Sequence, residues 1–195
     1  MTTRNVLIFD LDGTLMDTMD GITHAADTVL VERGWSALGR GFYESAIGGG
    51  ARALIEKAVT AAGGEEASVD EVLSAFLKAY KSSWSVGLNC YFEMESIVNR
   101  LNEEGFTIVV NTNKGHDLAV SVVRSVFSKS VIKEIEGSSS KRPKKPDPAG
   151  IDFLLSALGR TRAEAIYIGD SVVDVKTAKQ AGIPVIGVAW GYGDA

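Results

Sequence analysis

Residues 4–15 read Arg4-Asn5-Val6-Leu7-Ile8-Phe9-Asp10-Leu11-Asp12-Gly13-Thr14-Leu15, an apolar run that ends in two carboxylates and a glycine. Residues 6–9 are β-branched, aliphatic or aromatic and do not alternate with polar residues, which predicts a strand buried on both faces of a parallel sheet. Asp10 then stands at the carboxyl end of that strand. Because ligands bind at this edge of an open parallel sheet, Asp10 and Asp12 are candidate functional groups.

Two neighbouring carboxylates suit a phosphoryl transfer in two steps. One carboxylate attacks phosphorus, while the other protonates the leaving oxygen and later activates water. Taken alone, Asp10 and Asp12 could equally be turn residues after a strand. The residues at the carboxyl ends of the other strands decide between these interpretations.

The stretch from Asp10 to Leu15 resembles the nucleophile motif of the haloacid dehalogenase superfamily in its phosphatase form. A second strand is predicted over residues 106–110, and Thr112 and Asn113 after it resemble the second motif, which implies binding of phosphate oxygens. Lys145-Pro146-Asp147-Pro148 resembles the third motif. There the resemblance implies that Lys145 neutralises the nucleophile and the phosphate, which would otherwise repel each other in a crevice of low dielectric constant.

A further strand is predicted over residues 165–168, followed by Gly169-Asp170-Ser171-Val172-Val173-Asp174. If a helix begins near Ser171, Asp174 lies on its first turn and can point back toward Asp170, a pair that suits Mg²⁺. As a helix cap, Asp170 alone would need no metal. The segment resembles the fourth motif, which implies a metal held by Asp10, the Asp12 carbonyl and Asp170, with Asp174 in support.

Residues 16–86 have a different character from the rest of the chain. Apolar residues recur at helical spacing over residues 17–33, 51–62 and 69–80, and no strand pattern interrupts them. The superfamily resemblance implies that such an insertion is a cap that closes over the site, excludes water and carries specificity residues. Arg52 follows a glycine-rich turn and could bind the anionic end of a substrate; alternatively, the turn is only a flexible link between helices.

The expected fold is therefore α/β, with a Rossmann-like parallel sheet, helices on both of its faces and an inserted all-helical cap. Residues 1–15 and 87–195 are expected to form the core domain, and residues 16–86 the cap. Further strands are predicted over residues 130–135 and 183–188, and further core helices over residues 97–101, 118–127 and 149–158.

Composition excludes several classes of protein. The formal net charge of -5 argues against a general nucleic-acid surface. No segment approaches the roughly 20 apolar residues of a membrane span, so no membrane association is expected. Cys90 is the only cysteine, which excludes an intrachain disulfide and favours a reducing compartment. A cytoplasmic location is therefore expected.

The resemblance extends over nearly the whole chain and is nearest to the phosphoglycolate phosphatase-like group. It implies a Mg²⁺-dependent phosphatase that hydrolyses a small phosphorylated metabolite through an aspartyl-phosphate on Asp10, with Asp12 as general acid and then base. Asp12 favours phosphoryl transfer over dehalogenation, but it does not separate a phosphatase from a phosphosugar mutase or a pyrophosphatase. A catalytically silent interaction module is the alternative from a different class.

The chain departs from the family pattern in two places. Family members commonly carry a Pro-Gly step where this chain has Tyr91-Phe92-Glu93-Met94-Glu95, so the second hinge between core and cap is not defined by the sequence. Family members also usually continue beyond the fifth strand, so a terminal element is expected to be missing after residues 190–195.

Overall fold

The computed structural model describes residues 4–193, and its centre is a parallel sheet of five strands in the order β5-β4-β1-β6-β7. β1 is flanked on both sides, with Val6 opposite Thr107 of β4 and Ala165 of β6. All four residues of β1 are buried, which explains its unbroken apolar sequence. The strands are β1 Val6–Phe9, β4 Thr107–Gly115, β5 Ile132–Ser138, β6 Ala165–Gly169 and β7 Val185–Gly187.

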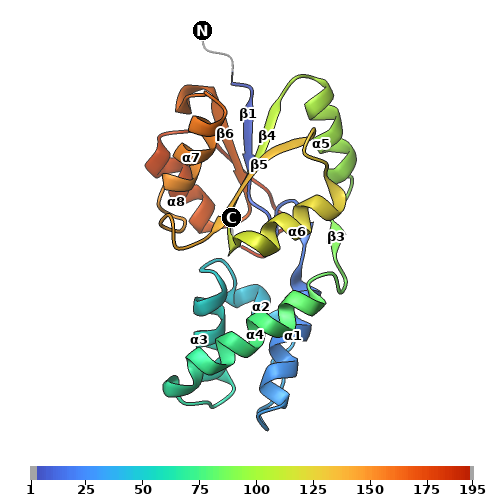
Figure 1. Cartoon of the computed structure of the whole chain (residues 1–195), viewed down its shortest axis with the longest axis vertical. Helices are drawn as coiled ribbons and strands as arrows, with labels where there is room; N and C mark the ends of the chain where they lie inside the picture. The colour runs from blue at the N-terminus through green and yellow to red at the C-terminus, as the bar shows by residue number, and fades with distance from the viewer. Residues whose placement is uncertain (1–3, 194–195) are drawn as a thin grey trace. The chain divides into compact units, whose positions relative to one another are not determined.

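Helices cover both faces of this sheet, as predicted. Figure 1 shows α7 and α8 on one side of the strands and α5 and α6 on the other. Alternate residues of the strands point to opposite faces, and Val6, Ile8 and Tyr167 pack with residues of α7 and α8 in one buried cluster. The expected α/β fold is confirmed. The helices are α5 Met94–Glu103, α6 His116–Val126, α7 Ala149–Ala157, the 3₁₀ helix η2 Arg162–Glu164 and α8 Val172–Ala181.

The chain divides into two compact units, one formed by Met1–Met16 with Cys90–Ala195 and the other by Asp17–Asn89. The second unit is helical. Short strands β2 and β3 pair where the chain passes from one unit to the other. These elements are β2 Met16–Asp17, α1 Met19–Val31, α2 Arg40–Ala46, α3 Ala51–Ala61, the 3₁₀ helix η1 Glu66–Ser68, α4 Val69–Ser83 and β3 Asn89–Cys90.

Three details differ from the sequence-based expectations. The pattern did not indicate α2, because its seven residues complete only two turns. β4 continues to Gly115 instead of ending at Val110, with an irregularity in its pairing to β5 between Asn111 and Gly115. Leu77 and Ile97 fit the apolar spacing of α4 and α5 but are 41% and 43% exposed. The helical period was right, but the buried stripe is narrower than the apolar one.

Among residues 4–193, no helix has the length and apolar character that crossing a membrane requires.

Candidate active site

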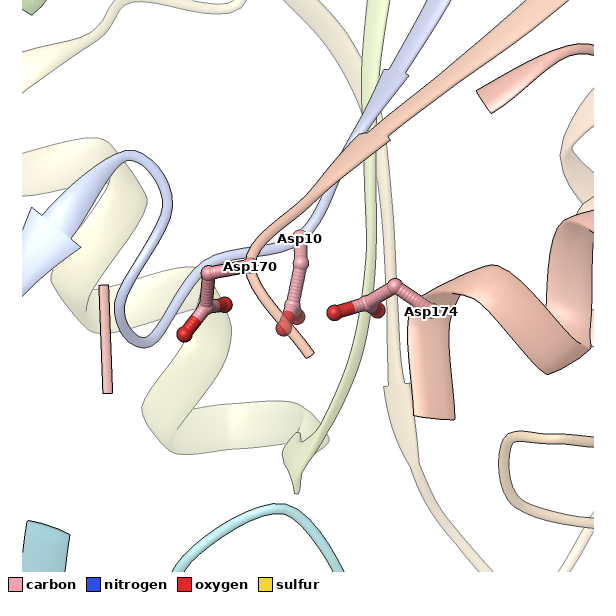
Figure 2. A group of neighbouring side chains, drawn as sticks. All are labelled: Asp10, Asp170 and Asp174. Atoms are coloured by element: carbon pink, nitrogen blue, oxygen red, sulfur yellow. The ribbon is translucent and has the colours of Figure 1, made fainter. Parts of the chain in front are cut away.

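Three aspartates meet at the carboxyl ends of adjacent strands. Asp10 follows β1, Asp170 follows β6, and Asp174 lies on the first turn of α8. One carboxylate oxygen from each lies within 4.8 Å of the others, and Figure 2 shows the three side chains converging. The pairing of Phe9 with Ile168 explains this convergence, because it brings the residues after each strand side by side. We call Asp10, Asp170 and Asp174 the aspartate cluster.

Asp174 is oriented by the start of α8. The backbone N–H of Asp174 donates to Ser171 Oγ at 3.3 Å, and the Ser171 backbone N–H and hydroxyl donate to Asp174 Oδ2 at 3.1 and 2.6 Å. This reciprocal capping box satisfies groups that a helix start leaves unpaired. It leaves the other carboxylate oxygen of Asp174, Oδ1, to contact Lys145.

Lys145 supplies a buried positive charge to the aspartate cluster. Its Nζ lies 2.9 Å from Asp10 Oδ1 and 2.7 Å from Asp174 Oδ1. Its backbone is held by the side chain of Asn113, which accepts from the Lys145 N–H at 2.9 Å and donates to the Lys145 carbonyl at 3.1 Å. The second and third sequence motifs are thus joined through Asn113 and Lys145.

Negative charge exceeds positive charge in the aspartate cluster. Burial, followed by the charge of Asp174, raises the pKa of Asp10 to about 7 even though Lys145 opposes the shift. Burial alone would lower the pKa of Lys145, but Asp10 and Asp174 raise it well above its usual value. The cluster therefore holds a lysine that stays charged and carboxylates that lack full compensation, which favours the binding of a further cation.

Asp170 is held by chain segments far apart in the sequence. The Thr14 hydroxyl donates to its Oδ1 at 2.9 Å, and the backbone N–H groups of Tyr192 and Gly193 donate to its Oδ2 at 2.8 and 3.1 Å. Gly13 has φ of +87°, and a Cβ there would lie 2.4 Å from Asp170 Oδ2. Only glycine therefore fits this turn. Neither Thr14 nor the segment after β7 was predicted from the sequence to hold a site residue.

Asp12 lies in a separate ion pair. Lys114 Nζ donates to Asp12 Oδ1 at 2.8 Å, and the two side chains are only 4% and 13% exposed. The Lys114 backbone N–H donates to Thr112 Oγ1 at 3.2 Å, so the second motif orients this lysine. Lys114 was assigned no role from the sequence. The available signal was a lysine among polar residues at the end of a buried strand.

Thr112 and Asn113, predicted to bind phosphate, are buried near Lys145. All three line one small cavity, together with residues from the segment after β5. On that segment Arg142 makes two hydrogen bonds to Glu136, at 2.6 and 2.8 Å. The polar residues of the second and third motifs thus share one location, although binding of phosphate there remains a prediction.

Arg52 lies on the first turn of α3 in the unit Asp17–Asn89. Its guanidinium pairs with Asp70, and its Nη1 lies 3.6 Å from Glu56 Oε1. Its side chain is 52% exposed. Its partners are therefore carboxylates of its own unit, and a contact with substrate remains a prediction.

The expected departure at the second hinge has a structural counterpart. Phe92 has φ of +42°, in the left-handed region that glycine adopts without strain, and it is 80% exposed. Its ring lies 5.6 Å from that of Trp190, whose Nε1 donates to the Thr14 carbonyl at 3.1 Å. Phe92 thus keeps a backbone conformation suited to glycine and adds an aromatic contact. The terminal residues 194–195 lie outside the described residues.

Several known proteins are similar to this chain in sequence or in fold. The phosphoglycolate phosphatase of Rhodospirillum rubrum is 31% identical over 192 residues, covering 95% of this chain and 80% of that protein. That of Yersinia pestis is 32% identical over 186 residues, covering 94% and 80%. A crystal structure described as a predicted phosphoglycolate phosphatase from Haemophilus somnus 129pt superposes with a TM-score of 0.91 at 25% identity, covering 99% of this chain and 88% of that one.

The sequence model of the family described as haloacid dehalogenase-like hydrolase matches residues 7–188, from β1 to the end of the sheet. The matched range contains the aspartate cluster, Asp12, Lys114 and Lys145. The resemblance noted from the four motifs is confirmed, and the chain belongs to the haloacid dehalogenase-like hydrolase family.

Proposed function

We propose that this protein is a Mg²⁺-dependent phosphatase that hydrolyses a small phosphomonoester of the phosphoglycolate type through an aspartyl-phosphate on Asp10. The observation that carries the proposal is the convergence of Asp10, Asp170 and Asp174, with Lys145 paired to Asp10 and Asp174. The relatives named phosphoglycolate phosphatase support the substrate class. A single free cysteine, Cys90, fits the expected cytoplasmic location.

The donor set of the site fits Mg²⁺, which prefers carboxylate and carbonyl oxygens. The fit rests on three buried carboxylates, two of them paired with Lys145, and on Asp170, which is already oriented by Thr14. Asp10, the Asp12 carbonyl and Asp170 would hold the ion. Asp174 would act in support, because its two oxygens already accept hydrogen bonds from Lys145 and Ser171. When bound, the ion would balance the carboxylates and polarise the phosphoryl group.

Asp10 is the proposed nucleophile. One of its oxygens forms a bond to phosphorus as the bond from phosphorus to the ester oxygen breaks, and Asp12 gives its proton to that departing oxygen. Asp12 then removes a proton from water as the water oxygen attacks phosphorus, which frees phosphate and restores Asp10. Lys145 fixes the attacking carboxylate and balances charge on the phosphoryl group.

The remaining predicted residues complete the proposal. Thr112 and Asn113 bind phosphoryl oxygens beside Lys145. The helical unit Asp17–Asn89 acts as a cap that excludes water. Arg52 of that unit recognises the anionic part of the substrate.

The direct test is phosphate release from a panel of phosphorylated metabolites in the presence of Mg²⁺. Asp10→Asn should abolish turnover with the fold intact, because the amide keeps the shape of the side chain but removes the attacking charge. Asp117→Asn, the same change at an exposed position on α6, is the matched control and should remain active. A fully active Asp10→Asn protein would exclude the covalent mechanism, and turnover of a sugar phosphate without phosphate release would indicate a mutase.

A further inference from the structure

The site contains two buried lysines, and they contact different aspartates. Lys145 lies against Asp10 and Asp174, the residues assigned to the phosphoryl group and the metal. Lys114 lies against Asp12, with its Nζ 2.8 Å from Asp12 Oδ1. Because Asp12 is assigned to the leaving oxygen, Lys114 lies on the side from which the leaving group departs.

The sheet fixes the position of Lys114. Lys114 belongs to β4, and its backbone N–H donates to the Thr112 hydroxyl. The neighbouring strand β5 approaches closely at Gly137, where a Cβ would lie 2.9 Å from the Lys114 carbonyl oxygen. The ammonium therefore stands on rigid backbone, and its burial keeps salt from screening its charge as it would on the surface.

We propose that Lys114 is a specificity residue that selects phosphomonoesters whose leaving group carries a carboxylate next to the ester oxygen. The inference rests on the proposed function. In phosphoglycolate one carbon separates the ester oxygen from the carboxylate, so a group that touches the acid for that oxygen is close to the carboxylate as well. An ammonium has three N–H donors that point in different directions, so it can bind Asp12 and a substrate carboxylate together.

The alternative is that Lys114 only positions Asp12. The two roles differ in the substrates that they affect. A positioning residue serves every substrate whose leaving oxygen needs a proton, whereas a specificity residue serves only those that carry the carboxylate. Phosphoglycolate and ethyl phosphate allow this comparison. Both have an alkoxide leaving group, and only the leaving group of phosphoglycolate carries a carboxylate.

The experiment measures kcat/KM for phosphoglycolate and ethyl phosphate with the parent protein, Lys114→Met and Lys114→Arg. The parent should prefer phosphoglycolate. Lys114→Met should reduce that preference by roughly 10- to 100-fold, the usual range for a hydrogen bond to a charged group. Lys114→Arg, which keeps the cation, should retain part of it. An equal loss on both substrates, with the ratio unchanged, would overturn the inference in favour of positioning alone.

Two controls keep the test independent of folding and catalysis. Lys129→Met removes an exposed lysine that does not line the site, and it should leave the preference unchanged. Calorimetric binding of phosphoglycolate to Asp10→Asn, with and without Lys114→Met, measures recognition without turnover. Equal affinities in those two proteins would contradict a contact with the carboxylate.

A comparison on the parent protein alone tests the inference should Lys114→Met fail to fold. Phosphoethanolamine, which places a cation near the position of the carboxylate, should be a poorer substrate than ethyl phosphate. The reverse order would overturn the inference. If the parent protein hydrolyses para-nitrophenyl phosphate but shows no preference for phosphoglycolate over ethyl phosphate, only the role of Lys114 is overturned. If it hydrolyses no phosphomonoester, the proposed function is overturned too.

Discussion

The hydroxyl of Thr14 donates a hydrogen bond of 2.9 Å to Oδ1 of Asp170, although the two residues lie 156 positions apart. This bond joins the loop after β1 to the end of β6. It fixes one oxygen of a candidate metal ligand before any metal is present, and such pre-orientation by a neighbouring donor strengthens metal binding.

Thr14→Val should therefore weaken Mg²⁺ binding. Valine keeps the shape of threonine but cannot donate, and loss of an outer partner typically costs roughly 10- to 100-fold in metal affinity. Titration of Mg²⁺ against phosphate release, or calorimetry, measures the change. Thr23→Val is the matched control, since the buried Thr23 hydroxyl has no hydrogen-bond partner within the part of the chain that the structure describes, residues 4–193. Unchanged Mg²⁺ affinity in Thr14→Val would mean that the bond does not orient Asp170.

Removal of the metal should abolish activity. Among residues 4–193, Lys145 is the buried cation paired with this cluster, and its ion pairs are with Asp10 and Asp174. Without the metal the phosphoryl group would therefore meet uncompensated negative charge. Treatment with a chelator should stop phosphate release, and excess Mg²⁺ should restore it. A protein that hydrolyses phosphomonoesters at full rate in chelator would contradict the assignment of Asp170.

The metal-free protein should become less stable as the pH rises from about 4 to about 7. Burial and Asp174 raise the folded-state pKa of Asp10 from 3.8 to about 7. In that window the folded state retains a proton that the unfolded state has lost, so the free energy of unfolding falls with increasing pH. The difference amounts to roughly 4 kcal/mol at most.

Asp10→Asn removes this group and should raise stability in chelator at pH 8, with a smaller gain at pH 5. Urea unfolding at the two pH values measures the effect. The exposed Asp117→Asn serves again as the control. An Asp10→Asn protein that is less stable than its parent at pH 8 would show that the ionised Asp10 carboxylate does not destabilise the folded state.

Asp12→Ala should reveal the order of the two chemical steps. With an aryl phosphate, whose leaving group needs little protonation, the variant should still phosphorylate Asp10 but hydrolyse the intermediate slowly, so aspartyl-phosphate should accumulate. With phosphoglycolate, the first step should slow as well, by roughly 100-fold or more, and little intermediate should form. Rapid acid quench and mass measurement of the peptide that contains Asp10 distinguish the two cases. Equal rates in parent and variant would remove Asp12 from the mechanism.

The sequence predicted those parts of the fold and site that local patterns carry. β1 was predictable because its apolar run ends at Asp10, and Asp174 was predictable because helix geometry alone turns it back toward Asp170. The pairing of Lys114 with Asp12 spans 102 positions, and it depends on the register between β1 and β4 and on burial of the amine. Neither of these can be read from a local window.

The same reason accounts for the other differences. Leu77 fits the helical period of α4 but is exposed, because the period marks an apolar stripe and not how much of it a neighbour covers. Phe92 gave no sign of its positive φ, since that conformation is imposed by the chain around it. The donors to Asp170 from Tyr192 and Gly193 are backbone groups, which almost every residue has and no motif records.

Those backbone donors give Asp170 a second task. The segment after β7 forms no helix or strand through residue 193, and two of its N–H groups end on this single carboxylate. Asp170 is therefore an anchor for the main chain as well as a candidate ligand. A substitution there would release the anchored segment together with the metal, so its loss of activity would combine a folding defect with a chemical one. Thr14→Val, which leaves the anchor in place, separates the two.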